Sequence, residues 1–234
     1  MKKQICAALG LCLLLAGCAG KSSPAQTLPA PEADAKPVVV GEPTQAPTVS
    51  DRTIVPMDDK VNLDNISDCI LAVSLNKGDA YVDDTGVMRM RLTVYDYDRY
   101  DMVDIAGLAV GDTILVQGTP VKVETLERDE YGLLHINGGL DADGVTLRTD
   151  EDGSFYQVQE NDAKAYQELG QVTVRVSADF LYTDESQLGE EPALYYPGDF
   201  LTDDGGIDYS FSPWSTKLRM ENGSAITMNR VFTP

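Results

Sequence analysis

Apolar and polar residues alternate along most of the chain after residue 57. In residues 88–94 two methionines, a leucine and a valine alternate with two arginines and a threonine. Residues 171–176 place valine at every second position, and residues 113–123 alternate on both sides of Gly118-Thr119-Pro120. A period of two is typical of antiparallel strands with one buried face, so each segment predicts a strand and the third a hairpin.

Short turn dipeptides separate these segments. Asn and Asp before Gly tolerate the positive φ of two-residue hairpin turns. They occur at Asn137-Gly138, Asp143-Gly144, Asp152-Gly153 and Asn222-Gly223. We therefore predict an all-β fold, an antiparallel barrel or sandwich of hairpins with roughly eight to twelve strands.

Three segments refine this picture. Residues 160–170 predict at most one short helix, near 160–169, which Gly170 would end. Residues 62–75 are ambiguous, but their Ile and Val content favours a strand. Residues 110–126 have the strand–turn–strand style of small barrels such as OB-like and SH3-like modules.

Composition divides the chain near residue 57. Residues 19–56 contain seven of the twelve prolines and no aromatic residue. Such a segment buries too little apolar surface to offset its chain entropy, so residues 18–56 are expected to form a disordered linker spanning on the order of 35 Å. Residues 57–234 hold all the aromatic residues and are expected to form a single all-β domain with one core.

The first eighteen residues have the pattern of an export signal. Lys2 and Lys3 precede an apolar stretch, residues 5–16, which is shorter than the roughly 20 residues of a spanning helix. The stretch ends in Leu15-Ala16-Gly17-Cys18, which resembles the lipobox of bacterial lipoproteins. The resemblance implies a signal peptide over residues 1–17, cleavage before Cys18 and a lipid on its thiol. It places the domain outside the cytoplasm, in the bacterial cell envelope, anchored to the membrane through Cys18.

The chain is strongly acidic. Removal of the signal takes away two of the 18 basic residues, leaving 16 against 38 acids and a formal charge of −22. That balance argues against nucleic acid as a partner, because phosphates require a basic surface. The signal also carries Cys6 and Cys12, so Cys69 would be the one thiol besides Cys18 and is expected to be a small buried residue.

Motifs for known catalytic machinery are missing from the sequence. His135 is the sole histidine and no Gly-x-Ser-x-Gly is present, which argues against a Ser-His-Asp hydrolase. Neither a Cys/His metal motif nor a glycine-rich phosphate loop occurs. We therefore assign no catalytic residue and no metal ligand, and the sequence favours a binding protein over an enzyme.

Acidic turns raise the question of calcium. They lie at residues 141–144, 150–153 and 203–208, but none fits the spacing of an EF-hand loop. Asp-Gly turn chemistry accounts for them, so no cofactor is expected and Ca²⁺ stays only as an alternative.

One segment combines tyrosines and aspartates in "VYDYDRYDMVD", residues 94–104. Strict alternation would direct Asp96 and Asp98 inward, where a carboxylate is costly. The strand could end at Val94, so that Tyr95 and Tyr97 cover the core and the aspartates are solvated, which we favour. Alternatively, the aspartates with Asp101 form an acidic rim of the barrel, with the tyrosines beside it, that takes a cation or a polar ligand.

A second aromatic segment lies at residues 193–214. It contains Tyr195, Tyr196, Phe200 and Trp214 in a long irregular stretch. Aromatic rings beside carboxylates could stack on sugars, but long loops are also packed by their own side chains. We favour a loop that plugs one end of the barrel, because large aromatic rings usually become buried.

These features predict a lipid-anchored binding or interaction module for an unknown envelope or extracellular ligand. Two alternatives stay open: a hydrolase of the cell envelope that works with two carboxylates, and a passive structural module.

Overall fold

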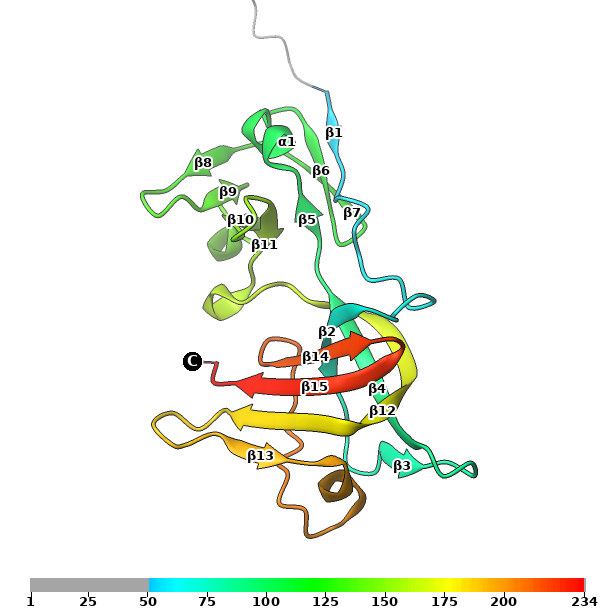
Figure 1. The fold of residues 1–234 in the computed structure, drawn as a ribbon. Helices are drawn as coiled ribbons and strands as arrows, with labels where there is room; N and C mark the ends of the chain where they lie inside the picture. Colours follow the sequence, from blue (N-terminus) through cyan, green and yellow to red (C-terminus); the bar gives the residue numbers. More distant parts are fainter. Residues whose placement is uncertain (1–50, 234) are drawn as a thin grey trace, which may run out of the picture. The chain divides into compact units, whose positions relative to one another are not determined.

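The computed structural model describes residues 51–233, which fall within one compact unit. Its elements in chain order are β1 (Thr53–Ile54), β2 (Cys69–Ser74), β3 (Ala80–Val82), β4 (Met88–Asp96), β5 (Arg99–Tyr100), α1 (Met102–Ala106), β6 (Thr113–Val116), β7 (Thr119–Lys122), β8 (Leu126–Arg128), β9 (Leu134–Ile136), η1 (Leu140–Ala142), β10 (Val145–Thr149), β11 (Phe155–Gln157), η2 (Glu160–Asp162), β12 (Gln167–Glu185), β13 (Ala193–Tyr195), η3 (Pro197–Leu201), β14 (Thr216–Glu221) and β15 (Ser224–Val231). Strands dominate, which confirms the all-β prediction (Figure 1).

Five strands close into a barrel. Hydrogen-bonded neighbours follow the order β12-β15-β14-β2-β4, and a further pairing of β4 with β12 completes the ring. Four of the five contacts are antiparallel, and β12 with β15 is parallel. A closed ring leaves no unpaired edge within these five strands. The edge strands β3 and β13 extend the sheet outside the ring.

The connectivity of this ring is distinctive. Counted along the chain, the barrel strands pair in the order first, second, third, fifth, fourth, and the fourth returns to the first. This order, with its parallel third and fifth strands, is that of the OB-fold, a five-stranded Greek-key barrel. The segment expected to have this style, residues 110–126, lies outside the ring and contributes β6 and β7 to a separate three-stranded sheet.

One long strand makes the closure possible. The first half of β12 pairs with β4, and its second half pairs with β15. Register shifts at Glu168/Gly170 and at Val176/Leu181 bend it between the two partners. At the first shift Gly170 has a φ of +142°, a region that residues with a side chain rarely adopt.

At most one short helix was expected near 160–169, and the structure stays within that limit. Only the 3₁₀ turn η2 forms, and Gln167 already pairs with Asp96 of β4. The helix-favouring residues of this segment are overridden by ladder hydrogen bonds to β4. Within residues 51–233 the one α-helix is α1, which begins after Asp101. The Asp101 carboxylate accepts a hydrogen bond from the Val103 amide at 2.7 Å and caps the helix.

Buried side chains form two large clusters instead of the one core expected. The barrel cluster is built on β2, β4, β12, β14 and β15. The second cluster belongs mainly to residues 97–166, which are inserted between β4 and β12 and are called the insert below. Ile54 of β1 is buried in this second cluster and so belongs to the packed domain, although it precedes the expected boundary at residue 57.

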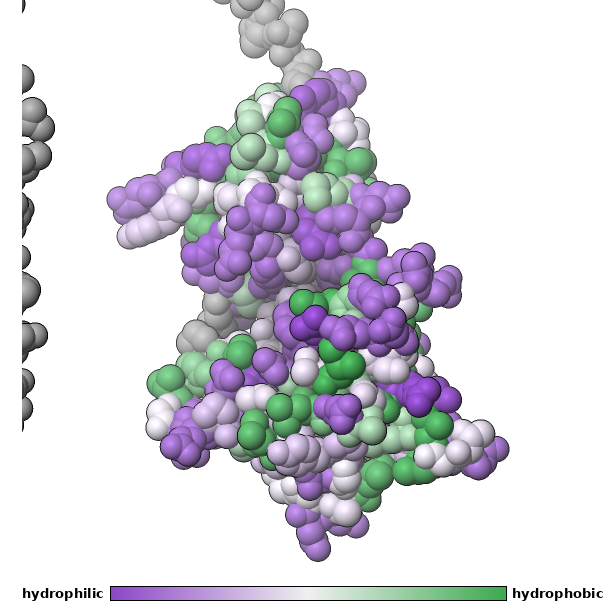
Figure 2. Space-filling view, viewed as in Figure 1, coloured by the Kyte–Doolittle hydropathy of each residue, from purple (hydrophilic) through white to green (hydrophobic). Residues whose placement is uncertain are grey.

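Two of the four predicted turn dipeptides, Asn137-Gly138 and Asn222-Gly223, have positive φ at both residues, but the first leads into η1 and not directly into a strand. Asn222 and Gly223 both have positive φ and join β14 to β15, as expected for a two-residue turn. In the β6–β7 hairpin the turn is Gln117-Gly118, one residue earlier than the predicted tripeptide. Figure 2 shows that hydrophilic residues cover much of the drawn face, with hydrophobic residues in small patches between them.

Candidate functional site

An open groove of about 1020 Å³ lies among the described residues. The insert contributes β11, η2 and the chain between η2 and β12, and the barrel contributes the loop before β14, β14 itself and the chain after β15. Its lining residues are Tyr156, Gln159, Glu160, Asp162, Ala163, Lys164, Tyr166, Trp214, Lys217 and Thr233. Clefts of this size with a few convergent polar groups are typical of ligand sites.

Four aromatic rings form a connected row at the groove. Tyr97 contacts the edges of Tyr156 and Tyr166, with ring centroids 5.9 and 5.3 Å apart. Tyr166 in turn contacts Trp214 edge-on at 6.4 Å. The indole Nε1 of Trp214 donates a hydrogen bond of 2.9 Å to the carbonyl of Lys164, which fixes the orientation of the ring. Trp214 keeps 42% of its surface exposed, so part of the indole is free to contact a ligand.

Lys164 is held at the groove by an ion pair. Its Nζ donates to Asp150 Oδ2 at 2.6 Å and to the Tyr97 hydroxyl at 2.7 Å. The same ammonium lies 4.3 Å from the ring centroid of Tyr97 and 4.8 Å from that of Tyr156. Burial alone would lower the pKa of Lys164, but the hydrogen bonds to Asp150 and Tyr97 raise it. Lys164 is therefore charged and already neutralised by Asp150.

Lys217 has a different environment. Its Nζ donates to the Tyr166 hydroxyl at 2.5 Å and to the Pro213 carbonyl at 3.1 Å, and it lies 4.6 Å from the Tyr166 ring centroid. Among residues 51–233 no carboxylate lies within ion-pair distance of it. Burial, with a contribution from the charge of Lys164, lowers the pKa of Lys217 to about 8.

Asp96 and Asp98 are neither solvated, as favoured from the sequence, nor part of an open acidic rim, the alternative. Asp96 is buried because the alternation of β4 continues through it, and its two oxygens accept hydrogen bonds of 2.9 Å from the amides of Val61 and Tyr97. Asp98 is also buried, accepting from the Gln117 amide at 2.7 Å and pairing with Lys60 at 2.6 Å. Asp96 joins the chain before β2 to the end of β4, and Asp98 joins that chain to the insert, so the oxygens of both carboxylates are occupied.

The remaining residues of that segment are dispersed. Asp101 caps α1 and is exposed. The Tyr95 hydroxyl shares a hydrogen bond of 3.1 Å with Ser74, on the barrel. Tyr97 is the exception, because it is buried under the groove, where its hydroxyl donates to Asp150.

The aromatic loop divides between two roles. Phe200 of η3 is buried in the barrel cluster against Phe180 and Tyr182, and Tyr195 stacks on Tyr182 with centroids 5.3 Å apart. These rings therefore pack into the barrel cluster. Tyr196 is largely exposed beside them, and Trp214 belongs to the groove.

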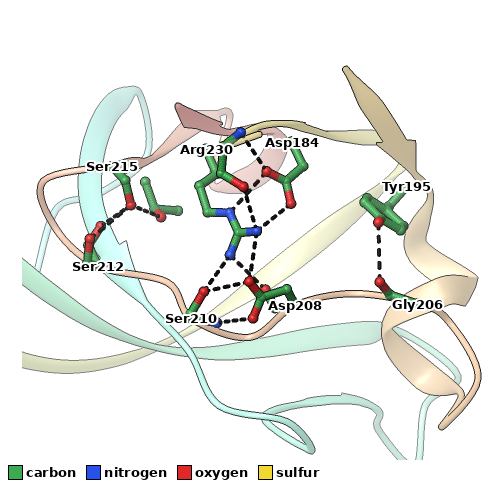
Figure 3. A network of polar contacts seen from close by, with 10 residues as sticks. Asp184, Tyr195, Gly206, Asp208, Ser210, Ser212, Ser215 and Arg230 are labelled. Atoms are coloured by element: carbon green, nitrogen blue, oxygen red, sulfur yellow. Dashed lines mark hydrogen bonds and ion pairs between the residues drawn. The ribbon is translucent and has the colours of Figure 1, made fainter. Parts of the chain in front are cut away.

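A second polar network lies where β12 meets β15. The buried guanidinium of Arg230 pairs with both oxygens of Asp184, at 3.0 and 2.6 Å, and donates to the Asp208 carbonyl and to Ser210 and Ser186 (Figure 3). A polar pocket of about 280 Å³ adjoins it, lined by several serines. Because Arg230 is fully engaged, we interpret this network as a brace between the two strands and the loop carrying Asp208.

Candidate metal and catalytic groups are also placed. Within residues 51–233 no three His, Cys, Asp or Glu side chains gather to hold a metal ion. In two of the acidic turns the carboxylate bonds a nearby serine, as Asp152 does with Ser154 and Asp208 with Ser210. His135 lies between Thr146 and Asp129. Cys69 is half-buried at the edge of the barrel cluster, and burial raises its pKa.

Comparison with known proteins adds no relative: no family model, no curated protein and no solved structure matches the chain. No helix within the described part of the chain has the length and apolar character needed to cross a membrane. Cys18 and the lipobox lie outside the described residues.

Sequence patterns identify only some of the residues at the groove. Trp214 and Tyr97 were singled out, but in different segments and for other reasons. Lys164, Lys217, Tyr156 and Tyr166 were missed because nothing in their local sequence distinguishes them. One signal existed: residues 155–166 combine two tyrosines with a lysine in a stretch of weak helical pattern.

Proposed function

We propose that this chain is a lipid-anchored, extracytoplasmic binding module of the bacterial cell envelope, and that the groove binds a glycan. The observation that carries the proposal is the row of aromatic rings ending in the half-exposed, hydrogen-bonded indole of Trp214. A flat, fixed and accessible ring provides a stacking surface for the apolar face of a sugar.

The polar groups of the groove support a glycan over other ligands. Gln159, Glu160 and Asp162 supply amide and carboxylate oxygens at its margin, where they can accept hydrogen bonds from sugar hydroxyls. The formal charge of the chain disfavours an oligonucleotide. OB-fold barrels are known to bind oligosaccharides, but this is an analogy at the level of fold, and the proposal rests on the groove itself.

The hydrolase alternative finds less support in the groove. A glycosidase requires one carboxyl group with a raised pKa to act as general acid. Asp150, the carboxylate beneath the groove, has a lowered pKa: burial opposes the shift, but hydrogen bonds from Lys164 and Tyr97 prevail. Glu160 and Asp162 are exposed at the margin. The passive structural alternative leaves the exposed indole and the groove without a role.

Trp214 is the sole tryptophan, so its emission reports on the groove directly. We expect the emission of the full chain to change in a saturable manner when it is titrated with bacterial cell-wall and plant-derived oligosaccharides, neutral and acidic. Calorimetry should show that W214A loses at least tenfold in affinity, whereas Y131A, which removes an exposed tyrosine of the β8–β9 turn, binds normally. Absence of any saturable response across the panel would contradict the proposal.

A further inference from the structure

The groove contains a cation to which residues 51–233 supply no anionic partner, in a protein that is otherwise rich in carboxylates. Lys217 donates to a hydroxyl and a carbonyl, which occupy two of its three N–H groups. The other described lysines, from Lys60 to Lys164, each have a carboxylate within 4 Å. With 38 acids in the chain, an ammonium in a cavity that none of the described carboxylates pairs with is the exception that needs an explanation.

The surroundings of Lys217 disfavour its positive charge. Lys164 lies close enough to repel it, and the neighbouring carboxylate Asp150 is committed to Lys164. Asp96 attracts it, but its oxygens are bonded to backbone amides. At the margin, Asp162 pairs with Arg148 at 3.5 Å, and Glu160 is exposed. This environment lowers the pKa of Lys217. A buried charge that destabilises the folded state in this way is typical of functional positions.

Lys217 and the stacking surface are adjacent. Trp214 precedes it by three residues, at the end of the loop that leads into β14, and both line the groove. Tyr166 connects the two directly, because it contacts the Trp214 ring and accepts the hydrogen bond from Lys217. A ligand that carries an anionic group directly on a ring can therefore contact both residues at once.

We infer that the groove selects acidic sugars, with the carboxylate of a uronate pairing with Lys217 while its ring lies against Trp214. The inference rests on the proposed glycan-binding function and adds the chemical class of the ligand. A peptide carboxylate would supply the charge without the ring, and the described groove offers no strand edge for a peptide backbone to extend.

The test compares a tri-galacturonate with its methyl ester, which keeps the rings and removes the charge. Titration of the full chain, followed by Trp214 emission, should show the acid binding about tenfold more tightly than the ester at pH 7, with the preference decreasing in high salt. The preference should also decline as the pH rises and Lys217 loses its proton. K217Q should bind acid and ester alike, at the affinity of the ester. K122Q, which removes an exposed lysine remote from the groove, should keep the preference.

Three results would overturn the inference. Equal binding of acid and ester by the unaltered chain removes the role of charge while leaving glycan binding intact. If an acidic tripeptide displaces a bound sugar as effectively as the uronate does, the sugar ring has no role in recognition. Loss of ester binding in K217Q, with circular dichroism unchanged, shows that Lys217 acts other than through the carboxylate. Failure of both sugars to bind contradicts the proposed function itself. The acid–ester comparison needs no variant, so it holds even if K217Q folds poorly.

Discussion

A buried carboxylate can serve as a structural hub when backbone amides occupy both of its oxygens. Asp96 ends β4 with its side chain buried on the same face as Val94, where an unpaired charge would be costly, and Arg99 lies 3.7 Å from one of its oxygens. One oxygen accepts from Tyr97, its neighbour in sequence, and the other from Val61, 35 residues earlier. The residue thus ties the chain preceding β2 to the point where the insert leaves the barrel.

Replacing Asp96 with asparagine tests this role. Asparagine has one acceptor oxygen, so D96N must turn an amide group toward one of the two N–H donors and leave that donor unsatisfied. We expect the free energy of unfolding in urea to fall by about 1–3 kcal/mol. D101N is the matched control, because Asp101 caps α1 and asparagine caps helices equally well. Equal stability of the two variants would show that the two hydrogen bonds to Asp96 do not stabilise the fold.

Lys217 gives a prediction with a defined pH window. Its pKa is about 8 in the folded chain against an ordinary 10.5, so the folded state binds fewer protons between these values and stability rises with pH across them. Below about pH 8 the full cost of the buried charge is present. K217M should therefore be more stable than the unaltered chain by on the order of 1–3 kcal/mol at pH 7.

The gain of K217M should shrink as the pH rises above 8 and disappear near 10.5. Thermal unfolding from pH 6 to 10.5 measures it, with K122M as the control because Lys122 is exposed. A gain that persists at high pH would indicate better packing of methionine and not the removal of a charge.

Alternation predicted the direction of Asp96 but not its surroundings. The rule that places Met90, Leu92 and Val94 inward also places Asp96 inward, as the structure shows. Its partner Val61 comes from a segment with no strand pattern, so the satisfied carboxylate could not be foreseen. The expectation that Asp96 is solvated was wrong. It considered the free-energy cost of burying the carboxylate, but not the backbone amides that donate hydrogen bonds to it.

At the scale of elements, the strands were predictable and their closure was not. Period-two patterns marked β4, the β6–β7 hairpin and the centre of β12. The contacts that close the barrel join β12 to β4 and to β15. The insert of some seventy residues separates β4 from β12, and the segment from β13 to β14 separates β12 from β15. Local sequence patterns carry no information on pairing between such distant strands. Because of the same pairing, residues 167–169 of the segment expected to contain at most a short helix are the first residues of β12.

The loop between β13 and β14 gives the prediction at this scale. If η3 plugs the barrel, F200A removes a buried ring in contact with Phe180 and Tyr182 and should cost about 3–5 kcal/mol of unfolding free energy. Y196A, in the same loop, removes an exposed ring and should cost little. Glycan affinity measured at temperatures where F200A is folded should be unchanged, and a loss of affinity without a loss of stability would move the site to this loop.

At the scale of the whole molecule, the groove arises from the insertion of one β-structure into another. Tyr156 and Lys164 belong to the insert, whereas Trp214 and Lys217 come from the barrel, some fifty residues later. Sequence analysis reached the all-β class and the acidic surface, but a site assembled from such distant segments appears only when the fold brings them together. The lipobox expectation, which concerns residues outside the described part, stays a prediction.

The central claim is that the groove is the binding site, and one resonance tests it most directly. The sole tryptophan gives a single indole N–H signal in a ¹⁵N–¹H spectrum, and that N–H is bonded to the carbonyl of Lys164 inside the groove. We predict that adding tri-galacturonate shifts this signal progressively until saturation. Binding that leaves the indole signal unmoved, while other resonances shift, would place the ligand elsewhere and contradict the account.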